Sequence, residues 1–155
     1  MGLAAVAVTL IGFSGVVTAL DLRRDNSWRR ADSIQLFALV APSIVTLFSA
    51  FVPIIVESLT ENSDFVWQAS NGVCFLGHLC GVSYFVRIGS GLPIRLSHKV
   101  GLTCTFLVMA LLLMSTLGIG SWYQFTFLLG LLLGIGVSVH NFYLLLSPTI
   151  AGDGN

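Results

Sequence analysis

Charged side chains are scarce in this sequence. The 155 residues include only seven Lys or Arg and seven Asp or Glu, which is 9% of the chain, and the formal net charge is zero. A soluble domain normally carries about 25% charged residues, because they keep its surface hydrated. The shortage therefore excludes an ordinary soluble domain, and the zero net charge gives no electrostatic reason to expect a nucleic-acid partner.

Cysteine is also rare, and no cysteine motif is present. The three cysteines, Cys74, Cys80 and Cys104, contain no CxxC pair, so we expect buried, reduced packing residues. The soft ligands Cys104, Met109 and Met114 follow at steps of five, which scatters them around a helix, so a copper site is not predicted.

Several catalytic and transport motifs are missing. The sequence contains no phosphate-binding loop, nucleophile elbow or HExxH motif. Its apolar segments contain no Lys, Arg, Asp or Glu, which excludes a retinal Schiff base, a carboxylate proton relay and a voltage-sensor helix. These absences favour a protein that is not an enzyme.

What the sequence does contain is long apolar blocks. Hydrophobic residues make up 55% of the chain. They are grouped in segments of about 20 residues, the length that a helix needs to cross a hydrocarbon core of about 30 Å. The segments are Gly2–Leu20, Ser33–Val56, Phe65–Val86, Val100–Ile119 and Gln124–Leu146. We therefore predict an all-α fold, a single transmembrane domain over residues 1–155 with five spans.

Two parts of this division have alternatives. Val17 and Ala19 give Gly2–Leu20 the small residues of a signal-peptide cleavage site, but its arginines follow the apolar run, which favours a retained span. The stretch Val100–Leu146 is too long for one crossing and is interrupted at residues 118–121 by Gly and Ser. Two helices joined by a tight turn are favoured, and a re-entrant segment is the alternative.

The basic residues predict the orientation in the membrane. All seven lie in the loops after the first and third spans: Arg23, Arg24, Arg29, Arg30, Arg87, Arg95 and Lys99. The loop after the second span is acidic. Under the positive-inside rule the basic loops are cytoplasmic, so the N-terminus lies outside and the C-terminus inside. Residues 23–30 also suit the surface of the inner leaflet, but nearby aspartates offset their charge and favour a purely topological role.

The start of the chain carries a family resemblance. The stretch GFSGVVTALDLRRDNSW, residues 12–28, leads through a basic loop into a second apolar helix. It resembles the start of some small uncharacterised bacterial integral membrane proteins. The resemblance covers about the first third of the chain and includes no chemical motif. It implies a bacterial inner-membrane protein, and no particular activity.

The third segment carries unusually many polar side chains for a membrane span. Asn71, Cys74 and His78 follow at i, i+3 and i+7, so they form one stripe on a helix. Such groups are costly in hydrocarbon unless they face protein, water or a ligand. We therefore expect Phe65–Val86 at the centre of the bundle, against the last span. The predicted polar contact consists of Asn71, Cys74, His78, His140 and Asn141.

Two histidines lie within spans that run in the same direction. Counted from the outer ends of these spans, His78 and His140 differ in depth by about 5 Å. Two histidines at one level, beside small residues, suit the ligation of a b-type haem in an electron-transfer subunit. The alternative is that each imidazole bonds a neighbouring Asn, Ser or backbone carbonyl and holds the bundle together. We favour the alternative, because a histidine pair alone specifies ligation weakly.

Small residues and prolines predict how the helices pack. Pairs of glycines at four-residue spacing mark lines of close helix contact. The pairs are Gly77 with Gly81 and Gly130 with Gly134. Packing within the bundle is favoured, and a homo-oligomer face is the alternative. In the second span, Pro42 and Pro53 each remove a backbone hydrogen bond, so we expect a bend near Pro42.

Together these features predict a small multi-pass protein of a bacterial inner membrane, with the lipid bilayer as its first partner. The favoured function is non-enzymatic, as a transport or channel component or as an accessory subunit of a larger membrane complex. The alternative is a haem-binding electron-transfer subunit that uses His78 and His140. No cofactor is favoured.

Overall fold

The computed structural model describes residues 30–89 and 96–151, together with residues 2, 5, 7–12 and 15 near the N-terminus. Within this part of the chain the secondary structure is entirely helical, with no strand. The helices are α2 (Arg30–Ser49), α3 (Val52–Glu57), α4 (Ser63–Gly89), α5 (Leu96–Thr116) and α6 (Tyr123–Ala151). The predicted all-α fold is confirmed.

Four helical segments are long and apolar enough to cross a membrane. They are Leu36–Glu57, Ser63–Arg87, Lys99–Thr116 and Tyr123–Leu144, which correspond to the second to fifth predicted spans. The first predicted span, Gly2–Leu20, lies largely outside the described residues, although residues 7–12 are helical. A helical bundle with four candidate membrane spans is therefore shown, whereas the total of five spans stays a prediction.

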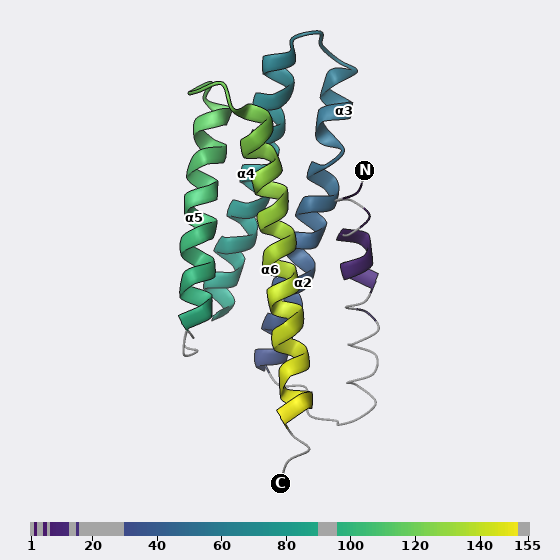
Figure 1. Cartoon of the computed structure of the whole chain (residues 1–155), viewed down its shortest axis with the longest axis vertical. Helices are drawn as coiled ribbons and strands as arrows, with labels where there is room; N and C mark the ends of the chain where they lie inside the picture. Colours follow the sequence, from purple (N-terminus) through teal and green to yellow (C-terminus); the bar gives the residue numbers. More distant parts are fainter. Residues whose placement is uncertain are drawn as a thin grey trace.

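The helix that contains the polar stripe is central. Helix α4 contacts α2, α3, α5 and α6, whereas α2 and α5, in the described part of the chain, contact α4 and α6 but not each other. Helices α4 and α6 run in the same direction, down from the turns at the top of Figure 1. Helix α6 likewise contacts α2, α4 and α5, so the third span shares the central place with the last span, and the expected contact between these two spans is confirmed.

The second predicted span consists of two helices with a break between them. Helix α2 continues through Pro42 and ends at Ser49, and α3 then begins at Val52 with Pro53 in its first turn. Proline has no amide hydrogen, and its ring clashes with the carbonyl four residues earlier, here that of Ser49. The break in the helix therefore lies next to Pro53, while α2 is continuous through Pro42 and the expected bend there stays a prediction.

The division between α5 and α6 agrees with the favoured prediction. Helix α5 ends at Thr116 and α6 begins at Tyr123, and the two form an antiparallel pair (Figure 1). In the turn between them, Gly118 and Gly120 have φ angles of 76° and 89°. Glycine adopts this left-handed conformation without the steric cost that a Cβ atom would add. Two helices joined by a tight turn are therefore confirmed.

Candidate functional site

The three residues of the predicted stripe are all buried against α6. Asn71 and Cys74 are fully buried, and His78 is 6% exposed. The Asn71 amide reaches the backbone of Tyr123, while Cys74 and His78 both lie beside Gly130. The face of α4 that carries polar groups is therefore the face that it presents to α6.

Asn71 is the centre of a hydrogen-bonded cluster that joins three helices. Its Nδ2 donates to the carbonyl oxygens of Trp67, at 2.8 Å, and Tyr123, at 2.9 Å. Its Oδ1 lies 3.0 Å from the hydroxyl of Thr126, which is 2.6 Å from the hydroxyl of Ser115. We call Asn71, Ser115 and Thr126 the Asn71 cluster. It links α4, α5 and α6, and it uses both ends of the Asn71 amide.

The sequence did not single out Ser115 and Thr126. A lone Ser or Thr in a membrane helix usually bonds a carbonyl of its own helix, so its presence does not predict a contact between helices. Thr126 does lie within 3.1 Å of the Trp122 carbonyl, but it also reaches Asn71 on another helix. Only the packing of α5 and α6 around α4 reveals the cluster.

The three cysteines have different surroundings. Cys74 is a packing residue, as expected, in a core with Val108, Leu112, Phe127 and Leu131. Cys80 and Cys104 are free thiols with exposed side chains, so the expectation that all three are buried was wrong for these two. Residues inside an apolar segment are not all buried in protein, because the lipid-facing side of a membrane helix is apolar as well.

His78 bonds a backbone carbonyl. Its Nε2 lies 3.0 Å from the carbonyl oxygen of Gly130 on α6. A carbonyl oxygen only accepts, so we assign the proton to Nε2, and the imidazole donates across the interface between α4 and α6. This contact is the kind that the favoured sequence interpretation expected, an imidazole that holds the bundle together.

His140 lies much further along the bundle than His78. The contacts of Asn71 with Tyr123 and of His78 with Gly130 define one register between α4 and α6. In this register Gly130 is level with His78, and His140 is ten residues beyond Gly130. Ten helical residues span about 15 Å, so the expected difference of about 5 Å was wrong.

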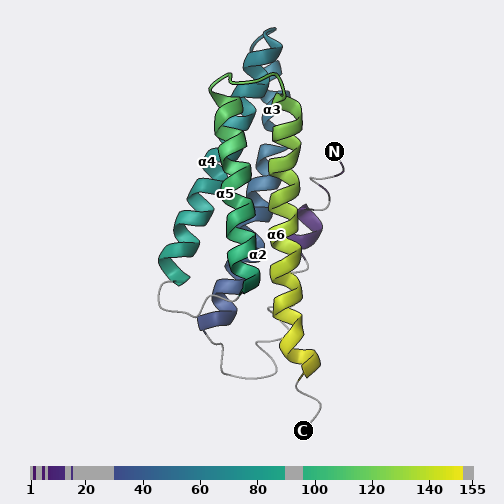
Figure 2. The ribbon, with the colours of Figure 1, turned by 60° about the vertical axis from the view of Figure 1, so that its left-hand side comes forward.

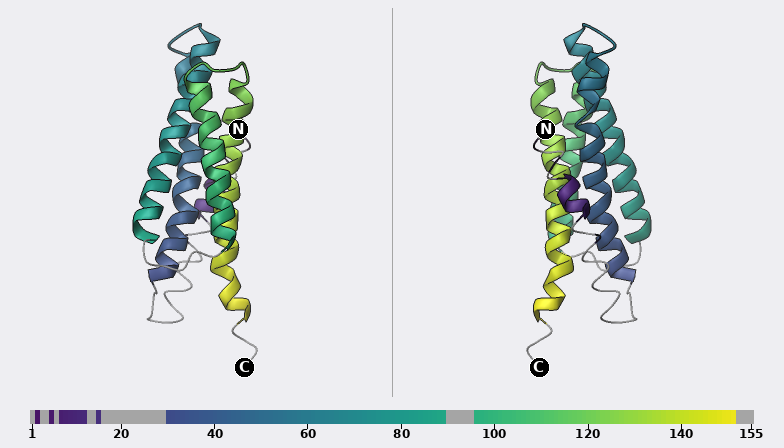
Figure 3. Two further views of the ribbon diagram at one scale, coloured as in Figure 1. Left: turned by 90° about the vertical axis from the view of Figure 1, so that its left-hand side faces the viewer. Right: turned by 90° about the vertical axis from the view of Figure 1, so that its right-hand side faces the viewer.

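The reason for this error is visible in the bundle. The prediction placed the outer ends of the third and fifth spans at one level, but Tyr123, the first residue of α6, is level with Asn71, eight residues into α4. The α3–α4 turn accordingly rises above the α5–α6 turn (Figure 1, Figure 3). Two ligands to one haem iron must reach the same atom, so this register opposes shared ligation by His78 and His140. The described residues also include no group of three or more His, Cys, Asp or Glu that could hold a metal ion.

Glycines allow the helices to approach closely at three of the four predicted positions. A Cβ atom at Gly77 would lie 2.6 Å from Val45 on α2, and one at Gly130 would lie 2.9 Å from the sulfur of Cys74. A Cβ atom at Gly134 would overlap the hydroxyl of Thr46 on α2. By contrast, no atom lies within 4 Å of the corresponding position at Gly81.

A second polar contact joins α2 to α6. The hydroxyls of Ser43 and Ser138 are 2.8 Å apart and fully buried. The Ser138 hydroxyl also lies 2.8 Å from the carbonyl oxygen of Leu39 and 2.9 Å from that of Gly134. These polar groups are used within the protein, as groups in hydrocarbon must be.

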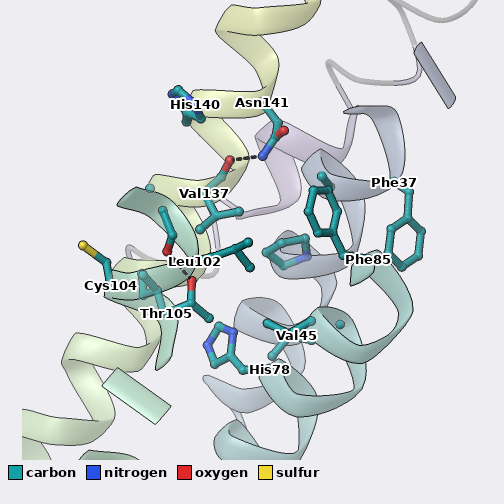
Figure 4. Close-up of a pocket in the computed structure, with 18 of the residues that line it drawn as sticks. Phe37, Val45, His78, Phe85, Leu102, Cys104, Thr105, Val137, His140 and Asn141 are labelled. Carbon is teal, nitrogen blue, oxygen red and sulfur yellow. Dashed lines mark hydrogen bonds between the residues drawn. The ribbon is translucent and has the colours of Figure 1, made fainter. Parts of the chain in front are cut away.

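A cavity of about 660 Å³ lies among α2, α4, α5 and α6. Toward their lower ends α4 and α5 diverge (Figure 2, Figure 3), and the cavity occupies this part of the bundle. The described residues that line it include no Asp, Glu, Lys or Arg. Among the residues that line it are Phe37, Val45, His78, Phe85, His140 and Asn141 (Figure 4). Gly81 also lines it, which explains the open space beside that glycine.

Asn141 differs from Asn71 in the use of its amide. The Asn141 side chain is 5% exposed, and its Nδ2 donates to the Val137 carbonyl of its own helix at 2.8 Å. Its Oδ1 has no hydrogen-bond partner in the described part of the chain, and in Figure 4 this oxygen points away from Val137. The five residues of the predicted polar contact therefore fall into two separate groups. Asn71, Cys74 and His78 hold α4 to α6, whereas His140 and Asn141 lie at the far end of the cavity.

The arrangement places an apolar cavity among the four candidate spans, and the described residues that line it carry no charge. Such a cavity can hold a molecule of low polarity. Comparison of the chain with protein-family models, with curated proteins and with solved structures gives no match.

Proposed function

We propose that this protein is a non-enzymatic membrane protein that binds a small apolar or amphiphilic molecule within the bilayer, as a transport component or as an accessory subunit of a membrane complex. The observation that carries the proposal is the cavity of about 660 Å³ among four apolar helices. Its volume lies within the range of about 300–1,000 Å³ that is typical of ligand pockets. The described residues of its lining are uncharged, which favours binding over catalysis by charged groups.

We further propose five spans in a bacterial plasma membrane, with the N-terminus outside and the C-terminus inside. The distribution of charge supports this orientation, and two further observations support the membrane setting. The described basic residues Arg30, Arg87 and Lys99 lie at the lower ends of α2, α4 and α5, whereas Glu61 and Asp64 lie at the opposite end. Trp122 is 72% exposed at that opposite end, where an aromatic residue suits the interface with water. The resemblance of residues 12–28 to bacterial membrane proteins supports the compartment.

The orientation predicts which engineered cysteines a membrane-impermeant maleimide labels. Glu61→Cys, in the α3–α4 turn, is expected to react in intact cells. Lys99→Cys, near the start of α5, is expected to react only after the membrane is permeabilised. The wild-type protein, whose own cysteines lie within the spans, gives the background. The opposite labelling pattern would show that the orientation is inverted.

Filling the cavity is expected to abolish binding. Gly81→Phe places a ring where no atom lies within 4 Å of the added Cβ, so the ring enters the cavity without displacing backbone. We expect the affinity for a hydrophobic fluorescent probe, measured by titration in detergent, to fall at least about tenfold. A tenfold change corresponds to about 1.4 kcal/mol of binding free energy. The matched control is Val73→Phe on the same helix, because Val73 is 45% exposed and does not line the cavity. Equal affinities in the two variants would contradict binding in this cavity.

A further inference from the structure

We infer that the molecule in this cavity carries a hydroxyl group, and that the Nδ1 nitrogen of His78 accepts the hydroxyl hydrogen. The ligand is therefore an apolar alcohol or phenol, two classes that share this chemistry. The inference names the ligand of the proposed function and rests on that function.

The imidazole of His78 is a buried polar group on the wall of the cavity. His78 is 6% exposed and lines the cavity. In Figure 4 its ring lies between Thr105 and Val45, which line the cavity as well. The contact of Nε2 with the Gly130 carbonyl at 3.0 Å holds one side of the ring against α6. The orientation of the second ring nitrogen, Nδ1, is therefore fixed by the packing of two helices.

This second nitrogen is accessible from the cavity. The bond of Nε2 is the one hydrogen bond that the His78 side chain makes within the described part of the chain, so Nδ1 has no partner there. The amide oxygen of Asn141, which also lacks a partner among the described residues, is fully enclosed, but Nδ1 of His78 is not. Because the space beside His78 is the cavity, a molecule inside the cavity can reach Nδ1.

The bond to Gly130 also determines the polarity of the missing partner. A carbonyl oxygen only accepts, so the proton of the neutral imidazole is on Nε2 and the lone pair is on Nδ1. The partner of Nδ1 must therefore donate a hydrogen bond. An ester, ether or ketone oxygen does not meet this requirement, but a hydroxyl group does.

The protein does not supply this donor from the described polar groups around the cavity. The hydroxyl of Thr105 donates to the Gly101 carbonyl at 2.8 Å, and the amide nitrogen of Asn141 donates to the Val137 carbonyl at 2.8 Å. A buried water molecule typically needs 2–4 polar partners, which a mainly apolar wall does not offer. The hydroxyl group of an apolar ligand needs only one partner, because the rest of the molecule makes apolar contacts.

The edge of the cavity lies within the membrane, which favours a neutral ligand. Val100 and Cys104 of α5 line the cavity and are also exposed, so they mark its edge. Cys104 is five residues, or about 7.5 Å, beyond Lys99, where the candidate span begins. A molecule that enters at this depth comes from the hydrocarbon, where a charged group is strongly disfavoured. The donor is therefore a neutral hydroxyl rather than an ammonium group.

The space beside His78 has room for the body of such a molecule. Gly81 lies three residues further along α4 and lines the cavity, and a Cβ atom added there would have no atom within 4 Å. The wall also includes the apolar side chains of Phe85 and Leu133. An alkylphenol, with its hydroxyl at His78 and its chain along this wall, therefore represents the ligand class.

The test compares two ligands that differ in one hydrogen-bond donor. In para-octylfluorobenzene a fluorine atom, close in size to a hydroxyl but without a hydrogen, replaces the hydroxyl of para-octylphenol. Both are titrated in detergent against the full-length wild-type protein, His78→Phe and Thr105→Val, and binding is measured by native mass spectrometry. Thr105→Val is the matched control, because Thr105 is also 6% exposed and lines the cavity, but its hydroxyl already bonds Gly101.

We expect the wild-type protein and Thr105→Val to bind the phenol about tenfold more tightly than the fluorinated ligand, the scale of one well-made hydrogen bond. His78→Phe is expected to bind both ligands with nearly equal affinity. Equal binding by the wild-type protein, a preference that survives in His78→Phe, or one that is lost in Thr105→Val would overturn the inference and leave the proposed function standing. If the wild-type protein bound neither ligand nor the fluorescent probe, the proposed function itself would fail.

A second measurement uses the wild-type protein alone, because His78→Phe also removes the bond to Gly130. Nitrogen NMR of protein with isotope-labelled histidine reports on the lone pair of Nδ1. We expect the phenol to shift the Nδ1 resonance of His78 and the fluorinated ligand to leave it in place. An unchanged resonance with the phenol bound would overturn the inference.

Discussion

Gly134→Leu is expected to destabilise the protein by about 3 kcal/mol, the upper end of the usual cost of overpacking a core. The interface between α2 and α6 is the most extensive between any two described helices. At its centre a Cβ atom on residue 134 would overlap the hydroxyl of Thr46 and lie 3.2 Å from the carbonyl oxygen of Pro42. A β-branched side chain and a backbone carbonyl have little freedom to move away, so the helices must separate. Reversible unfolding in mixed micelles with increasing SDS measures the loss.

Gly136→Leu is the matched control for this prediction. Gly136 lies two residues further along α6, and a Cβ atom added there would have no atom within 4 Å. The same substitution is expected to change the free energy of unfolding by less than about 0.5 kcal/mol, as for a site without close neighbours. Equal destabilisation by the two variants would mean that leucine at either position acts through something other than the contact with Thr46 and Pro42.

Asn71→Leu is expected to destabilise the protein by about 2 kcal/mol, which is the cost of leaving buried polar partners unsatisfied. Leucine has a similar size, so little cavity forms and the loss reports mainly on hydrogen bonds. The substitution removes the donor to the Tyr123 carbonyl and the acceptor of the Thr126 hydroxyl, and so it removes the polar link from α4 to α6 at this level. Individual hydrogen bonds between membrane helices average about 0.6 kcal/mol, so several must be lost together to reach this value.

The same substitution at Asn141 provides the comparison. Asn141→Leu removes only a bond to Val137 within α6, whose carbonyl also accepts a backbone hydrogen bond in the helix. We expect a change below about 0.5 kcal/mol, because no contact between helices is lost. Unfolding of both variants in SDS measures the two changes in the free energy of unfolding. Equal decreases for Asn71→Leu and Asn141→Leu would show that the hydrogen bonds of the Asn71 cluster do not stabilise the protein.

The sequence predicted the features that depend on local properties of the chain. The apolar blocks predicted the helices and the membrane-type bundle, because hydrocarbon thickness sets the length of a span. The interruption around Gly118 and Gly120 predicted the α5–α6 turn, because glycine accepts a positive φ angle. The spacing of Asn71, Cys74 and His78 predicted a single buried face, because helical periodicity places these side chains on one side.

Only the tertiary structure decided how far each helix extends along its neighbours. Hydropathy marks the ends of a span to within a few residues, and it carries no information on the axial offset between two packed helices. That offset is set by side-chain contacts such as His78 with Gly130, and it moved His140 to about 15 Å from the level of His78. The divergence of α4 and α5, and the cavity that Asn141 lines, are likewise products of packing. The sequence by itself thus determined the helices and their buried polar face, while the packing of the four helices decided which polar groups meet each other.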